Sequence, residues 1–246
     1  LRGAVIELLV SYSDRVVDGK SDDQGKDIAI MCYTLGQLKA RKPDIGKKGI
    51  NGLLDGIKNA LQQKSMTNQG LVNSLNGLQR MGLTWNDDIP ASSGLRSEIL
   101  QAAPQAVESM RQDEACSLLH SLALLKVSWS KSLPTELQNA LSNALEKHAP
   151  SFNNREIANV HWALGKLYYP YCTGGRLEQV LADMLVRRAH TFNQFDVEST
   201  FVGLGLMRAS FADLPEQAQA GLLGKVGAQV DTMNIFKLYN VLWGMA

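Results

Sequence analysis

The sequence predicts an all-α protein, an α-solenoid of helix-turn-helix repeats with a period of about 40–44 residues. Three observations predict this fold class. An apolar motif with helical spacing recurs six times, a segment rich in helix-forming residues follows five of the copies, and no stretch of useful length alternates like a strand. A single hairpin cannot bury its apolar faces, so neighbouring repeats supply the core.

The first helix of each repeat, helix A, carries the recurring motif. Its copies begin, at position 0, at Ile28, Leu71, Ala115, Ile157, Val197 and Leu238. Successive starts are 43, 44, 42, 40 and 41 residues apart. At about 100° per residue, positions 0, +3, +4, +7, +10 and +11 lie on one side of a helix. We predict that this side is the core face of helix A.

Two columns of the motif support this assignment. Position +7 is apolar in every copy: Leu35, Leu78, Leu122, Leu164, Leu204 and Met245. Position +6 is small in every copy: Thr34, Gly77, Ser121, Ala163, Gly203 and Gly244. The small column lies beside the apolar stripe, where a second helix can approach closely. We therefore expect helix A of each repeat to pack in parallel against helix A of the next.

The second helix, helix B, is rich in Ala, Leu, Gln and Glu, which are good helix formers. Proline stands between helix A and helix B in all five complete repeats, at Pro43, Pro90, Pro134, Pro170 and Pro215. Pro104 lies inside a predicted helix B, where we expect a kink or a break. The predicted organisation is a single solenoid over 1–246: a trailing helix at 1–22, hairpin repeats at 23–65, 66–109, 110–151, 152–191 and 192–232, and the start of a further repeat at 233–246.

Composition and motifs argue against an enzyme. The cysteines, Cys32, Cys116 and Cys172, are too scattered for a disulfide framework or a metal knuckle and are interpreted as reduced thiols. Cys116 and His120 share a helix face, but no second pair completes a four-ligand metal site. No nucleophile elbow, His-Glu-x-x-His motif or phosphate loop is present. We predict no catalytic residues, no metal and no cofactor.

The stretch "ANVHWALGKLYYP" at 158–170 places a histidine beside a tryptophan, a pairing that suggests a site. His161, however, occupies the repeat column that holds Leu75, Leu119 and Leu242 in other copies. The pair therefore belongs to the repeat pattern and is not a catalytic pair.

One copy of helix A, "FNNREIANVHWALGKL" at 152–167, is the clearest form of the motif. Its characteristic residues are Phe152, Asn159, Trp162, Ala163, Leu164 and Leu167. In this pattern the chain resembles the octotricopeptide repeat family and the related helical repeats that precede RAP domains in organellar RNA-binding proteins. The last copy matches through Met233, Asn240 and Trp243, whereas the middle copies have Asn76, His120 and Val202 in place of the tryptophan.

The resemblance implies RNA binding in a mitochondrion or chloroplast, in transcript stabilisation, processing or translation, or as a ribosome subunit. The chain begins at Leu1 and stops within an apparent helix, so we interpret it as a fragment or processed form. Any RAP domain would lie beyond Ala246. The formal net charge of +1 neither requires nor excludes a nucleic-acid partner, and no apolar run approaches the ~18 residues of a membrane span.

Position +2 of helix A is the first candidate RNA-binding column, because at this spacing it points away from the core. It holds short polar residues in five of six copies, Asn73, Ser117, Asn159, Ser199 and Asn240, with Ile30 in the remaining one. Such groups can hydrogen-bond to base edges. They can equally bond to a neighbouring helix or face water, and the sequence leaves both interpretations open.

The end of helix A is the second candidate, because each complete repeat has one cation there. These residues, at position +9 or +11, are Lys39, Arg80, Lys126, Lys166 and Arg208. A row of cations along one edge would form a track for a phosphate backbone. Compensation of the helix dipole explains the same charges without a ligand.

Aromatic residues give a weaker signal. We expect Trp162 and Trp243 to pack in the core, and Trp85, Trp129 and the pair Tyr168–Tyr169 to be partly exposed for base stacking. The predicted function is RNA binding through helix A of each repeat. The alternative is a protein–protein scaffold within a large organellar assembly, without RNA contact, and a ribosome-bound protein would combine both roles.

Overall fold

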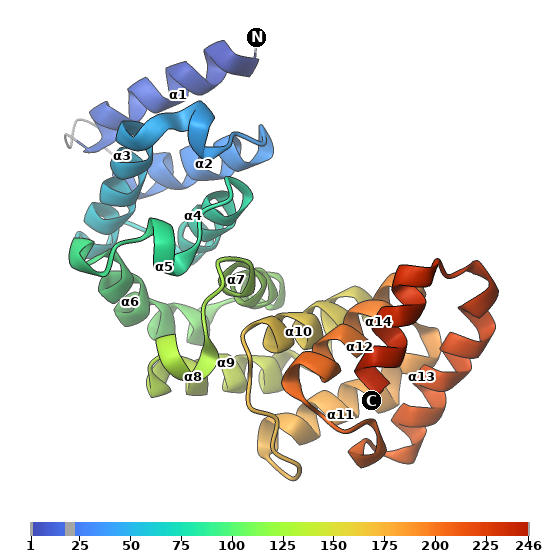
Figure 1. The fold of residues 1–246 in the computed structure, drawn as a ribbon. Coiled ribbons are helices and arrows are strands. Elements are labelled where there is room, and N and C mark those ends of the chain that lie inside the picture. The colour runs from blue at the N-terminus through green and yellow to red at the C-terminus, as the bar shows by residue number, and fades with distance from the viewer. Residues whose placement is uncertain (1, 18–22, 246) are drawn as a thin grey trace. The chain divides into compact units, whose positions relative to one another are not determined.

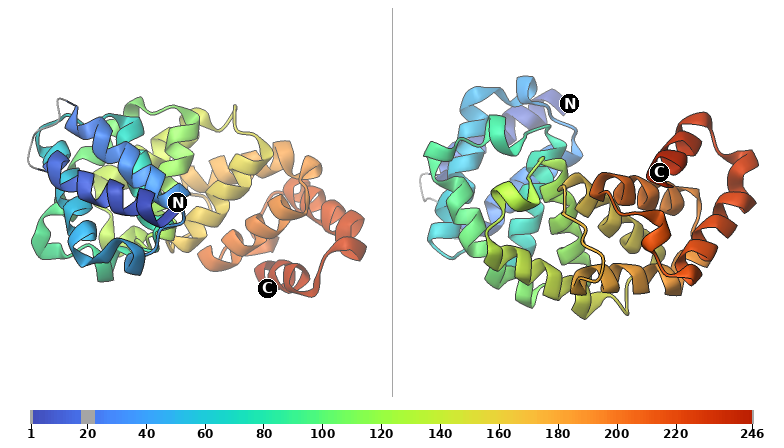
Figure 2. Two further views of the ribbon diagram at one scale, coloured as in Figure 1. Left: turned by 90° about the horizontal axis from the view of Figure 1, so that it is seen from above. Right: turned by 60° about the horizontal axis from the view of Figure 1, so that its bottom comes forward.

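Helices are the only regular secondary structure in the described part of the chain, which confirms the predicted all-α class. The computed structural model describes residues 2–17 and 23–245, with the backbone alone for 13–17. Figure 1 and Figure 2 show these residues as helices joined by loops, without a strand. Residues 1 and 18–22 of the predicted trailing helix, and residue 246 of the last predicted repeat, lie outside the described residues.

The chain divides into two compact units, Leu1–Val127 and Ser128–Ala246. Unit 1 contains α1 (Arg2–Val17), α2 (Gln24–Gln37), α3 (Lys42–Gln62), α4 (Asn68–Arg80), α5 (Trp85–Asp88), η1 (Ala91–Ser93), α6 (Leu95–Ser109) and α7 (Gln112–Leu124). In it the A helices α2, α4 and α7 pack in succession, and so do α1, α3 and α6, which occupy the helix B positions.

Unit 2 repeats this arrangement. It contains α8 (Trp129–Ser132), α9 (Thr135–His148), α10 (Asn154–Lys166), α11 (Arg176–Arg188), η2 (Ala189–Thr191), α12 (Gln194–Met207), η3 (Phe211–Asp213), α13 (Glu216–Gln229), η4 (Val230–Thr232) and α14 (Ile235–Met245). The A helices α10, α12 and α14 pack in succession, as do the B helices α9, α11 and α13. Figure 1 shows α10, α12 and α14 next to one another.

Side chains cap the beginning of helix A in several repeats. Before α10, the Asn153 side chain accepts a hydrogen bond from the Glu156 N–H (3.0 Å), and the Glu156 carboxylate accepts one from the Asn153 N–H (2.8 Å). Asn193 and Asp196 form the same reciprocal pair before α12. Each pair satisfies amide groups that the first helical turn leaves without partners.

Neighbouring A helices touch along the small column. A Cβ added to Gly203 would overlap the backbone carbonyl of His161, and one added to Gly244 would overlap that of Phe201. Gly77 stands in the same relation to Cys32 in unit 1. Position +6 of one helix thus lies against position +4 of the preceding helix at all three contacts. The small side chains let the backbones meet, and the +7 leucines fill the core beside them.

The helices that meet along this column run parallel. The partners of the side-chain hydrogen bonds between α12 and α14 advance together, from Gln194 with Lys237 to Glu198 with Asn240. In an antiparallel pair, one partner number would fall as the other rises.

The prolines mostly lie where the sequence predicted a restart. Pro43 stands in the first turn of α3, and Pro134 and Pro215 directly precede α9 and α13. Of the two outcomes expected at Pro104, the break is wrong, because α6 continues through this residue from Leu95 to Ser109. The kink stays a prediction, since an interior proline removes one intrahelical hydrogen bond and its ring crowds the carbonyl four residues earlier. The chain does kink in α3 at Gly46, whose φ of 72° is favourable for glycine.

The tryptophans do not lie where the sequence placed them. Trp85 and Trp129, predicted to be partly exposed, are only 2% and 3% exposed. Each donates its backbone N–H to the end of the next helix A, to Leu125 and Leu167 respectively, at 2.7 Å. Trp243, predicted to be core, is 42% exposed, and Trp162 is half-buried. The two tryptophans of helix A are thus the accessible ones.

Candidate functional site

The cations at the end of helix A are all exposed, and three of them occupy an unusual backbone conformation. Lys39, Lys126 and Arg208, at position +11, have φ of 53°, 61° and 58°. The N–H of the following residue bonds to the carbonyl of position +7, as Ala40 does to Leu35 at 3.0 Å. This is a left-handed helix cap, a position that favours glycine. Position +11 therefore does not belong to the core face, because the helix has already ended there.

The same cap recurs in five consecutive repeats. Gly82 and Tyr168 hold position +11 in the repeats whose cation stands two residues earlier, with φ of 83° and 55°. Glycine thus occurs at one of five equivalent left-handed positions, although it is the residue for which that conformation costs least.

Arg80 and Lys166, at position +9, lie on the outward side of helix A. Arg80 donates to the Gln37 side chain at 3.0 Å, which ties α4 to α2. Burial, and secondly the charge of Arg80, lower the pKa of His120 on α7. The Lys166 ammonium lies 5.7 Å from the centre of the Trp162 ring, a cation–π arrangement.

Two arginines outside the predicted set also reach the ends of helix A. Arg2 donates to the carbonyls of Leu38 and Lys39, both at 2.8 Å, and Arg41 donates to that of Arg80 at 3.3 Å. These bonds satisfy carbonyl groups that a helix end leaves without partners. They supply structural contacts that the sequence pattern did not predict, since each arginine acts on a helix of another repeat.

The polar residues at position +2 are half-buried or buried, although this position was expected to face away from the core. Asn240 donates to the Glu198 carboxylate of the preceding helix A, α12, at 2.8 Å, whereas Asn73 accepts from Gln69 of its own helix at 2.8 Å. Ser199 is only 6% exposed, whereas Ser117 and Asn159 are half-buried. The column departs from the expected direction because helix A has a helical neighbour on each flank as well as helix B behind it. Whether these groups contact RNA stays a prediction.

The accessible face of helix A is instead formed by positions −2, +5 and +9, here called the outer strip. In unit 2 its exposed or half-buried members are Arg155, Trp162, Lys166, Phe195, Val202, Leu206, Phe236 and Trp243. The Arg155 guanidinium lies 3.7 Å from the centre of the Phe195 ring, which joins α10 to α12 across this face. The sequence motif contained these residues, but only the position of the neighbouring helices shows which columns stay accessible.

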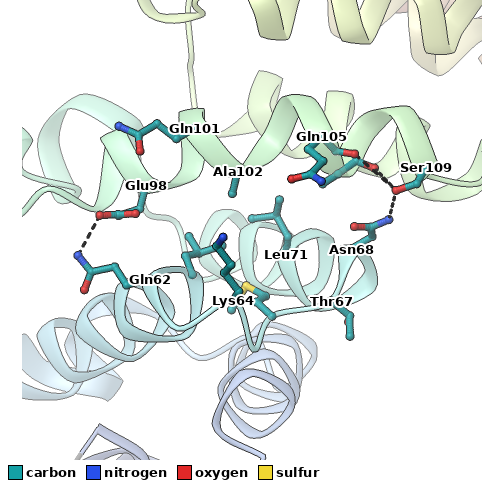
Figure 3. Close-up of a pocket in the computed structure, with 13 residues that line it drawn as sticks. Gln62, Lys64, Thr67, Asn68, Leu71, Glu98, Gln101, Ala102, Gln105 and Ser109 are labelled. Carbon is teal, nitrogen blue, oxygen red and sulfur yellow. Dashed lines mark hydrogen bonds between the residues drawn. The ribbon is translucent and has the colours of Figure 1, made fainter.

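A groove of about 450 Å³ lies elsewhere, between α3, α4 and α6 of unit 1 (Figure 3). Gln62 donates to Glu98 at 2.9 Å at one end, and Asn68 donates to Ser109 at 3.0 Å at the other. Leu71 and Ala102 line the space between these bridges, and Lys64 is at its edge. All ten predicted candidates are within the described part of the chain, and none of them lines this groove.

His161 and Cys32 are titratable groups that the fold buries. His161 is fully buried, and its Nδ1 lies 2.8 Å from the Ile157 carbonyl. Burial lowers the pKa of His161 to about 4 and raises the pKa of the Cys32 thiol to about 12. Both side chains are therefore neutral near pH 7. Among the described residues, no three metal-ligating side chains gather into a group.

No family model matches the chain, and no curated protein matches its sequence. None of the described helices is both long and apolar enough to span a bilayer.

Proposed function

We propose that this chain is an RNA-binding helical-repeat protein of an organelle, a mitochondrion or a chloroplast. In this proposal the repeats form a single α-solenoid over 1–246, and helix A of each repeat contacts single-stranded or ribosomal RNA. The chain is not an enzyme in this proposal and needs no cofactor. The packing of A helices on A helices and B helices on B helices, found in both units, supports the solenoid. The organellar location rests on the sequence resemblance.

The observation that carries the RNA proposal is the repeated cation at the end of helix A. Dipole compensation explains a positive charge anywhere in the last turn, and it amounts to only about 0.3–1 kcal/mol. It does not explain why Lys39, Lys126 and Arg208 hold left-handed positions where glycine costs less. A phosphate backbone that crosses successive repeats would favour an exposed cation at this point of each repeat.

The second candidate function is the alternative that the sequence left open, a protein–protein scaffold within a large organellar assembly without RNA contact. On α14, Ile235, Tyr239 and Leu242 are more than half exposed. Position +4 of a helix A is covered by position +6 of the next one, and α14 is the last described helix, so the exposure of Leu242 does not distinguish a protein partner from a further repeat.

Charge replacement tests the RNA proposal. We expect the variant with Lys39, Arg80, Lys126, Lys166 and Arg208 all changed to Gln to bind every RNA sequence more weakly. The slope of log K against log salt should flatten by about 0.7 for each lost phosphate contact. The measurement is fluorescence anisotropy with single-stranded RNA at several salt concentrations, after folding is checked by circular dichroism.

A control with the same change in charge replaces exposed cations of other elements: Lys47, Lys64, Lys131, Lys147 and Arg188. Equal weakening in both variants would show that net charge alone matters, and unchanged affinity in the first variant would leave the scaffold as the better proposal. A further variant replaces Asn73, Asn159 and Asn240 by Ala. We expect it to discriminate less between RNA sequences, with little change in the salt dependence of its RNA affinity. Crosslinking in native complexes would recover the bound RNA.

A further inference from the structure

The outer strip of unit 2 combines accessible aromatic rings with cations. Phe195 and Phe236 are 41% and 77% exposed, and Trp243 is 42% exposed. Trp162 is half-buried beneath Lys166. Phe236 and Trp243 lie on the last described helix, whereas Phe195 lies on α12, which has a helix A on each side and still leaves this ring exposed.

The register of the helices places these residues in two rows. Gly203 lies against the His161 carbonyl, and Gly244 lies in the same way against the Phe201 carbonyl. The step from α10 to α12 is therefore the same as the step from α12 to α14. Position +5 forms one row, Trp162–Val202–Trp243, and position −2 forms the other, Arg155–Phe195–Phe236.

Local contacts hold the rings on this face. Gly205 of α12 leaves room for the Trp243 ring, because a Cβ at Gly205 would meet the ring atoms Cζ3 and Cε3 at 2.6 and 2.9 Å. The Arg155 guanidinium stacks on Phe195 at 3.7 Å. The rings thus lie on a helical scaffold instead of on loops, which reduces the entropy lost when a planar ligand binds.

The charges beside the rings favour a polyanion. Arg155 and Lys166 are exposed on the strip, and Lys237 is half-buried next to it. Glu198, at position +1 of α12, accepts a hydrogen bond from Asn240 at 2.8 Å. Cations next to aromatic faces are the combination that single-stranded nucleic acids use, since phosphates meet the cations and bases stack on the rings.

We propose that Trp162, Phe195, Phe236 and Trp243, with Arg155 and Lys166, form a base-stacking site for unpaired RNA. This inference rests on the proposed RNA-binding function and deepens it, because it selects single strands over duplexes. In an A-form duplex the base faces are stacked on one another and are unavailable to side chains. Adjacent A helices lie about 8–10 Å apart, so bases bound on successive helices are splayed and not stacked on each other.

The unmodified full chain provides the first test through its own fluorescence. Of its four tryptophans, Trp85 and Trp129 are buried, and Trp162 and Trp243 are accessible. We expect a single-stranded oligouridine to quench the accessible pair and leave the buried pair emitting. A duplex RNA of the same length should quench much less at equal phosphate concentration.

A variant provides the second test. Trp162→Leu, Phe195→Leu and Trp243→Leu together should weaken binding of the oligouridine by about 10- to 100-fold, because base stacking on aromatic rings is individually strong. Duplex binding should change little. The matched control is Leu223→Ala with Val230→Ala, which removes exposed apolar groups from α13 and η4 in the same unit. Circular dichroism checks that each variant folds. The milder variant Trp162→Phe keeps an aromatic ring and should bind the oligouridine more tightly than the triple variant does.

The outcomes separate the two proposals. If the full chain binds no RNA of either form, the proposed function fails and this inference fails with it. If the chain binds oligouridine without quenching, and the triple variant binds as tightly as the control, the stacking site is wrong while RNA binding stands. Loss of a protein partner in the triple variant, with RNA affinity unchanged, would assign the strip to a protein interface and overturn the inference.

Discussion

Gly203→Ala is expected to destabilise unit 2, because the small column sets the distance between α10 and α12. A methyl group at this position would overlap the carbonyl carbon and oxygen of His161 and the backbone nitrogen of Trp162. All three atoms would be less than 3.0 Å from the added Cβ, and real Cβ atoms essentially never come that close to another heavy atom. They belong to the backbone of a helix, so no side chain can rotate away, and the two helices must separate.

The magnitude follows from two opposing contributions. Overpacking of a tight interface typically costs about 1–3 kcal/mol and occasionally more. Separation of the helices also loosens the packing around the buried residues Phe201 and Leu204. Replacing glycine by alanine inside a helix returns about 1 kcal/mol. Because the clash is with backbone atoms, we take the upper end of the overpacking cost and expect a net loss of about 2 kcal/mol in the free energy of unfolding.

Gly224→Ala is the matched control. Gly224 lies inside helix α13, is exposed, and a Cβ there would have nothing within 4 Å. This variant should be more stable than the natural chain by about 0.5–1 kcal/mol, from helix propensity alone. The two substitutions are chemically identical, so the difference between them isolates the contact between helices.

Urea unfolding followed by both circular dichroism and tryptophan fluorescence is the assay. Two probes are needed because the chain has two compact units, and their transitions need not coincide. If Gly203→Ala is as stable as Gly224→Ala, the backbones of α10 and α12 do not meet at this column, and the reasoning is refuted. Gly77→Ala should repeat the loss in unit 1, where the added Cβ meets Cys32.

Three further sets of substitutions test other features. The pKa of His161 falls from 6.5 to about 4 on folding, so only the unfolded chain binds a proton between these pH values, and stability should fall as the pH drops through this window. His161→Leu should remove this fall of about 3 kcal/mol in the free energy of unfolding. If urea unfolding of His161→Leu and of the natural chain depends on pH in the same way, His161 is not the group responsible. Glycine at the left-handed cap, in the variants Lys39→Gly, Lys126→Gly and Arg208→Gly, should raise the free energy of unfolding by about 1 kcal/mol each, because glycine adopts this backbone conformation without strain. The same variants should bind RNA more weakly in anisotropy measurements. A loss of stability would argue against the left-handed cap. Leu164→Ala and Leu204→Ala should each lower the free energy of unfolding by about 2–5 kcal/mol in the same urea assay, and thermal stability equal to that of the natural chain would show that these side chains are not core.

The sequence by itself determined the helical class and the apolar core column of helix A. Leu164 and Leu204 were assigned to the core from position +7, and both are buried. Gly203 was assigned to a close approach from position +6, and it meets the preceding helix there. These assignments succeed because helical spacing is local, and the repeat displays each column several times.

The tertiary structure alone decided which polar and aromatic residues are accessible. Trp85 and Trp162 cannot be told apart by hydropathy, yet the first is buried and the second lies on the outer strip. The polar residues at position +2 were expected to point outward and are half-buried or buried, because helix A has helical neighbours on its flanks as well as behind it. The left-handed caps at Lys39 and Arg208 also escaped the pattern, since periodicity continues past the residue where a helix ends. Exposure depends on neighbours far away in sequence, and local spacing does not contain them.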